Sequence, residues 1–191
     1  MKLSILIVNY NTEKFILNFL TDLCKQTIAE NSYEVVIVNN VQNNALNYAV
    51  KKSQSSNKIN IQIISSEKNI GFSRAMNLAA KNAKGEHLLI ANPDLRMMQD
   101  DYLDTLIRNA ELNSNYGLIT TQIINDDQED KSEFYDFEFN ETFGFEDKIA
   151  WFSGALLLIR NNVMQKLTVS IQIFSCTVKM KIYAYASKNL V

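Results

Sequence analysis

The sequence predicts an α/β fold in which a doubly wound, mostly parallel sheet carries helices on both faces. Short apolar runs, partly β-branched, alternate along the chain with longer segments whose apolar residues recur at helical spacing. Strands that alternate with helices of this length imply parallel pairing and a sheet covered on both sides. With 191 residues, the chain is long enough to fold around a single core.

Each expected element follows from a local pattern. An apolar run marks the first strand, and the apolar residues behind the candidate caps Asn11 and Thr12 repeat as on a helix. Strict alternation around Asn60 and Gln62 marks the third strand. The expected strands are 3–8, 33–38, 59–64, 87–91, 118–124 and 150–159, and the expected helices are 15–23, 45–52, 71–83, 102–110 and a short one capped by Asn161 or Asn162.

Residues 126–147 interrupt this alternation. They are acidic and rich in aromatic side chains, and they show no clear repeat. A long stretch of this kind in a compact domain is typical of a functional lid or a disordered segment, and a solvated loop with a few anchoring aromatics is the simpler alternative. The sequence leaves these alternatives open.

Composition excludes several classes of function. The net charge of −2 and the lack of a Lys/Arg-rich block argue against a nucleic-acid groove. The two cysteines lie far apart, and the apolar run at the amino end is too short for a signal peptide, so we expect a cytoplasmic protein. No stretch reaches the roughly 20 apolar residues that cross a bilayer. If the protein works on lipid, we expect it to meet the membrane from the side.

Polar clusters follow several of the expected strands. The first strand ends in Asn9, Tyr10 and Asn11, the second in Asn39 and Asn40. A loop after the third strand covers 69–77, and the fourth strand ends in Asn92, Pro93 and Asp94. Parallel strands bring their carboxyl ends to one edge of the sheet, where open α/β sheets bind ligands. We therefore expect these segments to converge in a pocket.

Such a pocket suits a nucleotide whose diphosphate is bridged by a divalent metal. Magnesium takes one or two carboxylates and completes its shell with water and substrate phosphates, so Asp94 alone would suffice. Gly71 lets the backbone approach a ligand, and Arg74 with the adjacent helix end can meet phosphate oxygens. The alternatives are ordinary turn chemistry at Gly71 and at Asn92-Pro93-Asp94.

Five segments carry a resemblance to a known family. They read LSILIVNYNT, EVVIVNN, NIGFSRAMN, LLIANPD and WFSGALLLIR, and they lie between about residues 3 and 166. In order and approximate spacing the chain resembles the family 2 glycosyltransferases of the GT-A fold, especially the bacterial rhamnosyltransferase-like branch that builds surface polysaccharides. The resemblance implies an inverting glycosyltransferase that moves a sugar from a nucleotide-diphosphate donor, of the dTDP-rhamnose or UDP-sugar type, to a glycan or lipid-linked acceptor.

The resemblance also implies roles for particular residues. Asp94 would hold the Mg or Mn ion, and Trp151, Ser153 and Gly154 would border the sugar and the acceptor. The implied donor-binding residues are Asn9, Tyr10, Asn11, Asn39, Asn40, Asn69, Gly71, Phe72, Arg74, Asn77 and Asn92. Where the family usually has Asp-Asn after the second strand, this chain has Asn39-Asn40. A side-chain amide can still hydrogen-bond the edge of a uracil or thymine base, but unlike a carboxylate it carries no charge.

The resemblance breaks off after about Lys166. Relatives continue with a Gly-Gly-Phe-Asp-like turn and a Glu-Asp segment that supplies the catalytic base, whereas residues 167–191 contain no acidic residue. Permitted codons for this tail, read from the third nucleotide of Leu167, can encode Asp-Gly-Phe-Asp and then Ser-Glu-Asp-Glu-Asp. We therefore expect a nucleotide-sugar-binding GT-A domain at 1–166, incomplete at its C-terminal end, and an aberrant, frameshifted tail at 167–191 without the catalytic base.

Three other functions remain open at this point. A dinucleotide-dependent oxidoreductase needs Gly-x-Gly-x-x-Gly after the first strand, where this chain has Asn9-Tyr10-Asn11. A nucleotidyltransferase usually has a Gly-rich basic loop there. The third alternative is an inactive remnant that keeps only nucleotide binding.

Overall fold

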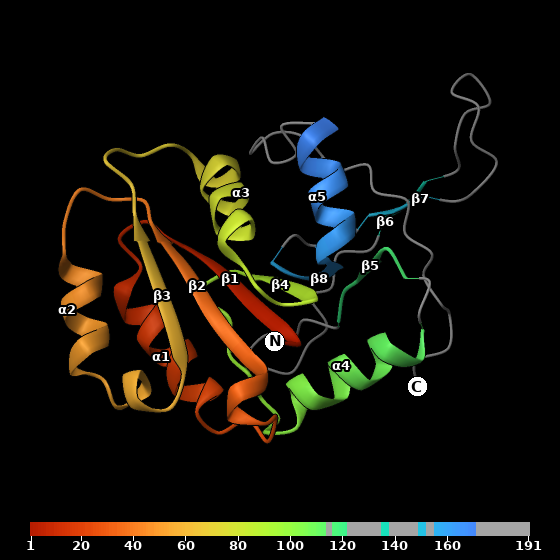
Figure 1. Ribbon diagram of the computed structural model, residues 1–191, viewed down its shortest axis with the longest axis horizontal. Helices are drawn as coiled ribbons and strands as arrows, with labels where there is room; N and C mark the ends of the chain where they lie inside the picture. The colour runs from red at the N-terminus through yellow and green to blue at the C-terminus, as the bar shows by residue number, and fades with distance from the viewer. Residues whose placement is uncertain (114–115, 122–134, 138–148, 152–154, 171–191) are drawn as a thin grey trace.

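The computed structural model describes residues 1–113, 116–121, 135–137, 149–151 and 155–170, and it confirms the predicted α/β class. Six strands form one sheet in the order β3-β2-β1-β4-β8-β5 (Figure 1). Strands β1 to β4 pair in parallel, while β8 pairs antiparallel with β4 and with β5. The strands are β1 (Leu3–Asn9), β2 (Tyr33–Asn39), β3 (Asn60–Ser65), β4 (His87–Ala91), β5 (Leu118–Ile119) and β8 (Leu156–Arg160).

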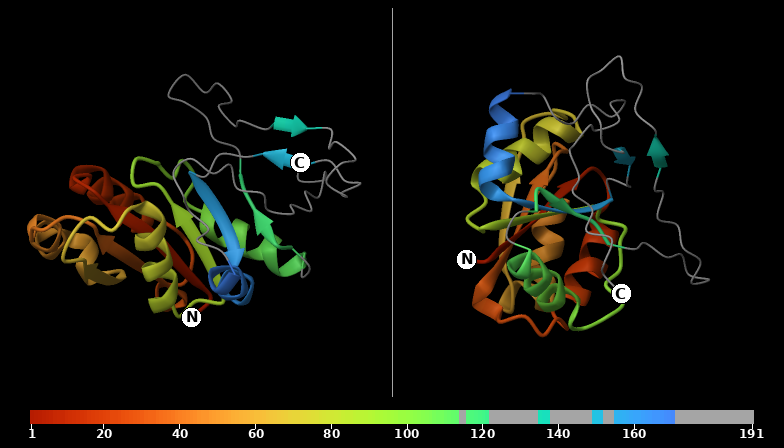
Figure 2. Two further views of the ribbon diagram at one scale, coloured as in Figure 1. Left: turned by 90° about the horizontal axis from the view of Figure 1, so that it is seen from above. Right: turned by 90° about the vertical axis from the view of Figure 1, so that its right-hand side faces the viewer.

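Helices cover both faces of this sheet, as Figure 2 shows for α1 on one side and α3 and α5 on the other. The helices are α1 (Glu13–Leu23), α2 (Ala45–Lys52), α3 (Phe72–Asn82), α4 (Tyr102–Leu112) and α5 (Asn161–Ser170), with 3₁₀ turns at η1 (Glu30–Ser32) and η2 (Gln54–Asn57). None of the helices in the described ranges is long and apolar enough to pass through a bilayer.

The apolar runs are explained by two cores, one on each side of the sheet. Ile5 and Ile7 of β1 pack into the core that includes α1 and α4, whereas Leu6 and Val8 belong to the core beneath α3. Successive side chains of a strand point to opposite faces, so a strand buried on both faces must be apolar throughout. This is why β1 and β2 lack the polar alternation of a half-exposed sheet.

The far edge of the sheet differs from the sequence prediction. The strand expected at 150–159 is divided into β7 (Ile149–Trp151), which pairs with β6 (Tyr135–Phe137) in a separate sheet, and β8. Strand β8 lies antiparallel between β4 and β5, and neither composition nor periodicity indicates strand direction. The strand expected at 118–124 is described only as Leu118–Ile119, and most of 126–147 lies outside the described residues.

The prediction of Thr12 as an N-cap is confirmed in position, whereas the side chains predicted to cap form their hydrogen bonds elsewhere. Thr12 does precede α1, but its hydroxyl donates to Asn9 Oδ1 at 2.9 Å and makes no cap bond. Asn161 is the first residue of α5, and its Nδ2 donates to the Gly85 carbonyl at 2.8 Å. Both side chains therefore donate to acceptors outside the helices that the sequence predicts they cap.

A buried polar cluster joins the amino ends of β1 and β2 to the chain before β4. Ser4 Oγ donates to Glu34 Oε1 at 2.7 Å, and the same oxygen accepts from the Lys84 amide at 2.7 Å. The Gly85 amide donates to Ser4 Oγ at 2.8 Å. A Cβ at Gly85 would lie 2.4 Å from the Ser4 nitrogen, so the close approach of two backbones requires glycine here.

Replacing Gly85 with alanine should therefore destabilise the protein by about 1–3 kcal/mol, the usual cost of overpacking. Denaturant unfolding measures the change, with Lys84→Ala as the matched control. Lys84 is exposed, and its substitution should stay within about 0.5 kcal/mol. Equal midpoints for the two variants would contradict the account of this contact.

Candidate active site

A cleft of about 530 Å³ opens where the parallel strands end. Four segments form its wall: the junction of β1 and α1, the residue after β2, the loop before α3 and the turn after β4. The lining residues are Val8, Tyr10, Thr12, Phe15, Asn40, Asn69, Gly71, Phe72, Asn92, Pro93 and Asp94. The polar strand ends therefore converge, as the parallel topology requires.

Asn40 ties the end of β2 to the loop before α3. Its Nδ2 donates to Asn69 Oδ1 at 2.9 Å, and its Oδ1 accepts from the Ile70 amide at 3.0 Å. Asn69 Oδ1 also accepts from the Gly71 amide at 2.8 Å. Asn40 is buried and lines the cleft, so one side chain both shapes the loop and borders the ligand space.

Asn9 and Asn39 are fully engaged with the protein and do not line the cleft. Asn9 Nδ2 donates to Asn39 Oδ1 at 2.7 Å and to Glu13 Oε1 at 3.1 Å. Asn39 Nδ2 donates to the Asn43 carbonyl at 2.8 Å, a bond that an ionised aspartate at position 39 would lack. Both side chains are buried, and they hold the turns that follow β1 and β2.

Gly71 begins the helix that borders the cleft. Its φ of +83° lies in the region that glycine adopts without strain, while the space around its Cα is open. Gly71 is the N-cap of α3 and offers no side chain to occupy this helix end. Helix amino ends attract anions, so the arrangement suits a phosphate group.

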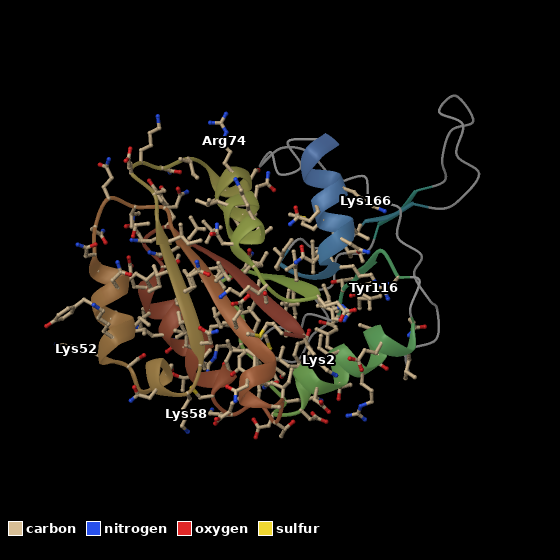
Figure 3. All side chains as sticks on the ribbon, viewed as in Figure 1. Lys2, Lys52, Lys58, Arg74, Tyr116 and Lys166 are labelled. Carbon is tan, nitrogen blue, oxygen red and sulfur yellow. The ribbon has the colours of Figure 1, made fainter. Side chains whose placement is uncertain are left out.

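Besides Asn9 and Asn39, three further implied donor residues lie off the cleft lining. Arg74 is exposed, and its side chain points outward beyond the start of α3 (Figure 3). Asn11 is exposed with a φ of +58°, and Asn77 is half-buried with an Oδ1 atom that has no hydrogen-bond partner among the described residues. The acceptor-side residues Ser153 and Gly154 lie outside the described residues, as does the side chain of Trp151.

Asp94 occupies a tight turn directly after β4. The Asn92 amide donates to the Ala155 carbonyl at 2.8 Å, and the Leu95 amide donates to the Asn92 carbonyl at 3.4 Å. The Asp94 side chain is exposed at the cleft, and among the described lining residues it alone carries a charge. The described ranges hold no group of three His, Cys, Asp or Glu side chains that would enclose a metal ion. One carboxylate beside an amide fits Mg or Mn, which take their remaining ligands from phosphate and water.

The sequence prediction missed three cleft residues on the β1–α1 side, Val8, Thr12 and Phe15. Phe15 is assigned by periodicity to the apolar face of α1, yet it is 50% exposed and lines the cleft. Thr12 also lines the cleft, although the sequence marks it only as a possible cap. Helical spacing correctly identifies Ile16, Phe19 and Leu20 as buried, but it does not indicate that the first turn of α1 borders the cleft.

Comparison with known proteins shows the family. The family described as Glycosyl transferase family 2 matches residues 4–181. The chain belongs to this family. Poly(ribitol-phosphate) beta-N-acetylglucosaminyltransferase TarS of Staphylococcus aureus is 30% identical over 126 residues, which cover 65% of this chain and 22% of the relative. This family 2 chain thus spans about a fifth of that relative's length.

Solved structures show the same fold. The TarS 1-349 structure in complex with UDP-GlcNAc has a TM-score of 0.63 at 19% identity and covers 88% of this chain and 48% of that one. The mannosyltransferase PcManGT from Pyrobaculum calidifontis, in complex with GDP-Man and Mn2+, has a TM-score of 0.64 at 17% identity over 87% of this chain and 46% of that one. The predicted GT-A fold of this family 2 chain is therefore confirmed.

Replacing Asn40 with alanine should free the loop before α3, because the Ile70 amide loses its acceptor and Asn69 Oδ1 loses one of its two donors. Leaving buried polar groups unpaired costs about 1–3 kcal/mol. Hydrogen exchange at the Ile70 and Gly71 amides should accelerate, whereas the control Asn44→Ala alters an exposed side chain without a cap bond and should leave both rates unchanged. Unchanged exchange in the Asn40 variant would contradict this role.

Proposed function

We propose that this chain binds a nucleotide-diphosphate sugar in the cleft and serves transfer of the sugar, with inversion, to a glycan or lipid-linked acceptor in surface polysaccharide synthesis. The observation that carries the proposal is the meeting of Asp94, Gly71 and Asn40 at one cleft. Family membership supports the reaction class. The proposal places the chain in the cytoplasm, where it meets a lipid-linked acceptor peripherally at the inner face of the membrane.

The donor is proposed to be a UDP-sugar or a dTDP-sugar such as dTDP-rhamnose. TarS has been solved with UDP and with UDP-GlcNAc, which supports a pyrimidine nucleotide. In this chain Tyr10 offers a half-exposed ring and Asn40 an amide at the cleft, a combination that suits the flat face and polar edge of a base. Asn9 and Asn39 support this wall from behind.

The diphosphate is assigned to the start of α3 and the turn at Asp94. The helix end at Gly71 attracts its negative charge, and Asp94 with Asn92 would hold the Mg or Mn ion. A bound divalent ion stabilises the charge of the departing nucleotide diphosphate. The exposed Arg74 lies at the same helix end, within the first turn of α3, and can add to the positive potential there. Trp151, Ser153 and Gly154 are proposed to border the acceptor.

We also propose that residues 1–166 form the donor-binding domain and that residues 167–191 are read in a shifted frame. The support is the codon argument: a single shift can restore an acidic segment of the kind the family has, while the present tail has no Asp or Glu. The family match reaches residue 181 and overlaps this tail, so sequencing of the gene is the direct test. Nucleotides that encode no Glu-Asp segment in another frame would overturn this proposal.

The lack of acidic residues in the tail favours a second candidate function, nucleotide binding without transfer. Loss of a positioned general base lowers the rate by about 10²- to 10⁴-fold. Donor hydrolysis by this chain, compared with a version whose frame is restored, distinguishes the two functions. Equal turnover in both would show that the tail does not supply the base.

Replacing Asp94 with asparagine should remove the metal dependence of nucleotide binding. Calorimetry with UDP or dTDP in the presence of Mn²⁺ should show at least about tenfold weaker binding, since disturbing even a group that orients a metal ligand costs 10–100-fold. Binding in EDTA should be unchanged. The control Asp101→Asn alters an exposed acid without a cap bond. Equal binding with and without metal by the unaltered chain would contradict the role of Asp94.

A further inference from the structure

The segment that follows Asp94 is held by helix α1. Residues 95–101 belong to neither a helix nor a strand, although they join the central strand β4 to α4. Such a segment needs bonds from elsewhere to keep one conformation. The second half of α1 and the residues after it provide them, and the contact nearest to Asp94 comes from Asp22.

Asp22 hydrogen-bonds to this segment at Arg96 and Met97, two and three residues after Asp94. Arg96 donates from Nε to Asp22 Oδ2 at 2.5 Å and from Nη2 to Oδ1 at 2.9 Å, a forked pair of charge-assisted bonds. The Met97 amide donates to the same carboxylate at 3.3 Å. Asp22 is only 3% exposed, whereas the Arg96 side chain is 56% exposed. The hydrogen bond from Arg96 lowers the pKa of Asp22, so the carboxylate is ionised at neutral pH.

The far end of the segment is fixed separately. Gln26 Nε2 donates to the Gln99 carbonyl at 2.7 Å, and the Thr27 amide donates to the Asp100 carbonyl at 2.8 Å. These bonds hold residues 99 and 100. Nearer to Asp94, Leu95 and Met97 pack against the core, and Asp22 supplies the polar contact from α1. Because α1 also presents Phe15 to the cleft, one helix sets the position of two cleft walls relative to each other.

We propose that Asp22 is a positioning residue for Asp94: by gripping Arg96 and the Met97 amide, it holds the Asp94 turn where a metal-bound diphosphate can reach it. This inference rests on the proposed function of the cleft. A misplacement of about 1 Å at a reacting centre can lower a reaction rate about 10²-fold. A loosened Asp94 turn should therefore weaken metal-dependent nucleotide binding.

The test measures UDP and dTDP binding by calorimetry, with Mn²⁺ and with EDTA, in the full chain. Asp22→Asn keeps the size of the side chain but places an amide against the guanidinium, and it should weaken metal-dependent binding about tenfold, the lower end for groups that orient metal ligands. Binding in EDTA should not change. Arg96→Ala should weaken this binding in the same direction, and the double variant should be no weaker than Asp22→Asn alone, because that variant already disturbs the Arg96 contact.

Asp104→Asn is the matched control, since Asp104 pairs with Arg108 at 2.7 Å on the exposed side of α4. It should leave both affinities unchanged. A merely structural role of Asp22 would lower the melting temperature without changing the ratio of the affinities with and without metal. Should Asp22→Asn fail to fold, Arg96→Ala decides alone, because its side chain is mostly in solvent.

The outcomes separate this inference from the function on which it rests. If Asp94→Asn removes metal dependence while Arg96→Ala and Asp22→Asn retain it in full, the positioning role is overturned and the proposed function stands. Equal weakening with and without metal also overturns the positioning role. If the unaltered chain binds UDP and dTDP without regard to metal, or binds neither, the proposed function fails and this inference fails with it.

Discussion

The hydrogen bonds between asparagine side chains at the strand ends are the constraint on which the cleft depends. Asn9 bonds to Asn39, and Asn40 bonds to Asn69, so the turns after β1, β2 and β3 are joined across neighbouring strands. Asn9, Asn39 and Asn40 are buried, where an unpaired polar group is costly. The loops therefore keep one arrangement, and the cleft that they border is formed before any ligand arrives.

A second constraint comes from α1, which contacts the cleft at its first turn and the Asp94 segment at its last. The helix is fixed to the sheet by buried residues such as Phe19 and Leu20. Its position is thus set by the apolar core, and the polar contacts of Asp22 and Gln26 transfer that position to a segment without regular structure. The core in this way determines the geometry of a polar site.

Much of the fold could be predicted from the sequence because strands buried on both faces must be apolar throughout. The runs at β1, β2 and β4 show this directly, and the rule that parallel strands end at one edge predicts the meeting of Asn40, Gly71 and Asp94. The antiparallel direction of β8 could not be predicted, since reversing a strand changes neither its composition nor its periodicity.

The candidate site was predictable at the level of segments and less so at the level of side chains. Whether an asparagine faces a ligand or another asparagine depends on partners distant in sequence. The sequence therefore does not distinguish Asn9 and Asn39, which bond within the protein, from Asn40, which lines the cleft. Phe15 has the helical spacing of the core residues of α1, yet its side chain is half exposed. The ion pair between Asp22 and Arg96 joins residues 74 positions apart, and a single sequence does not indicate it.

The most direct test of the account is to locate the metal with Mn²⁺ as a paramagnetic probe, in an NMR titration of the chain with UDP. We expect the amide signals of Asn92, Asp94, Leu95 and Gly71 to broaden first, because these groups surround the proposed site of the ion and the diphosphate. Broadening centred on another part of the chain, with these four signals unaffected, would contradict it.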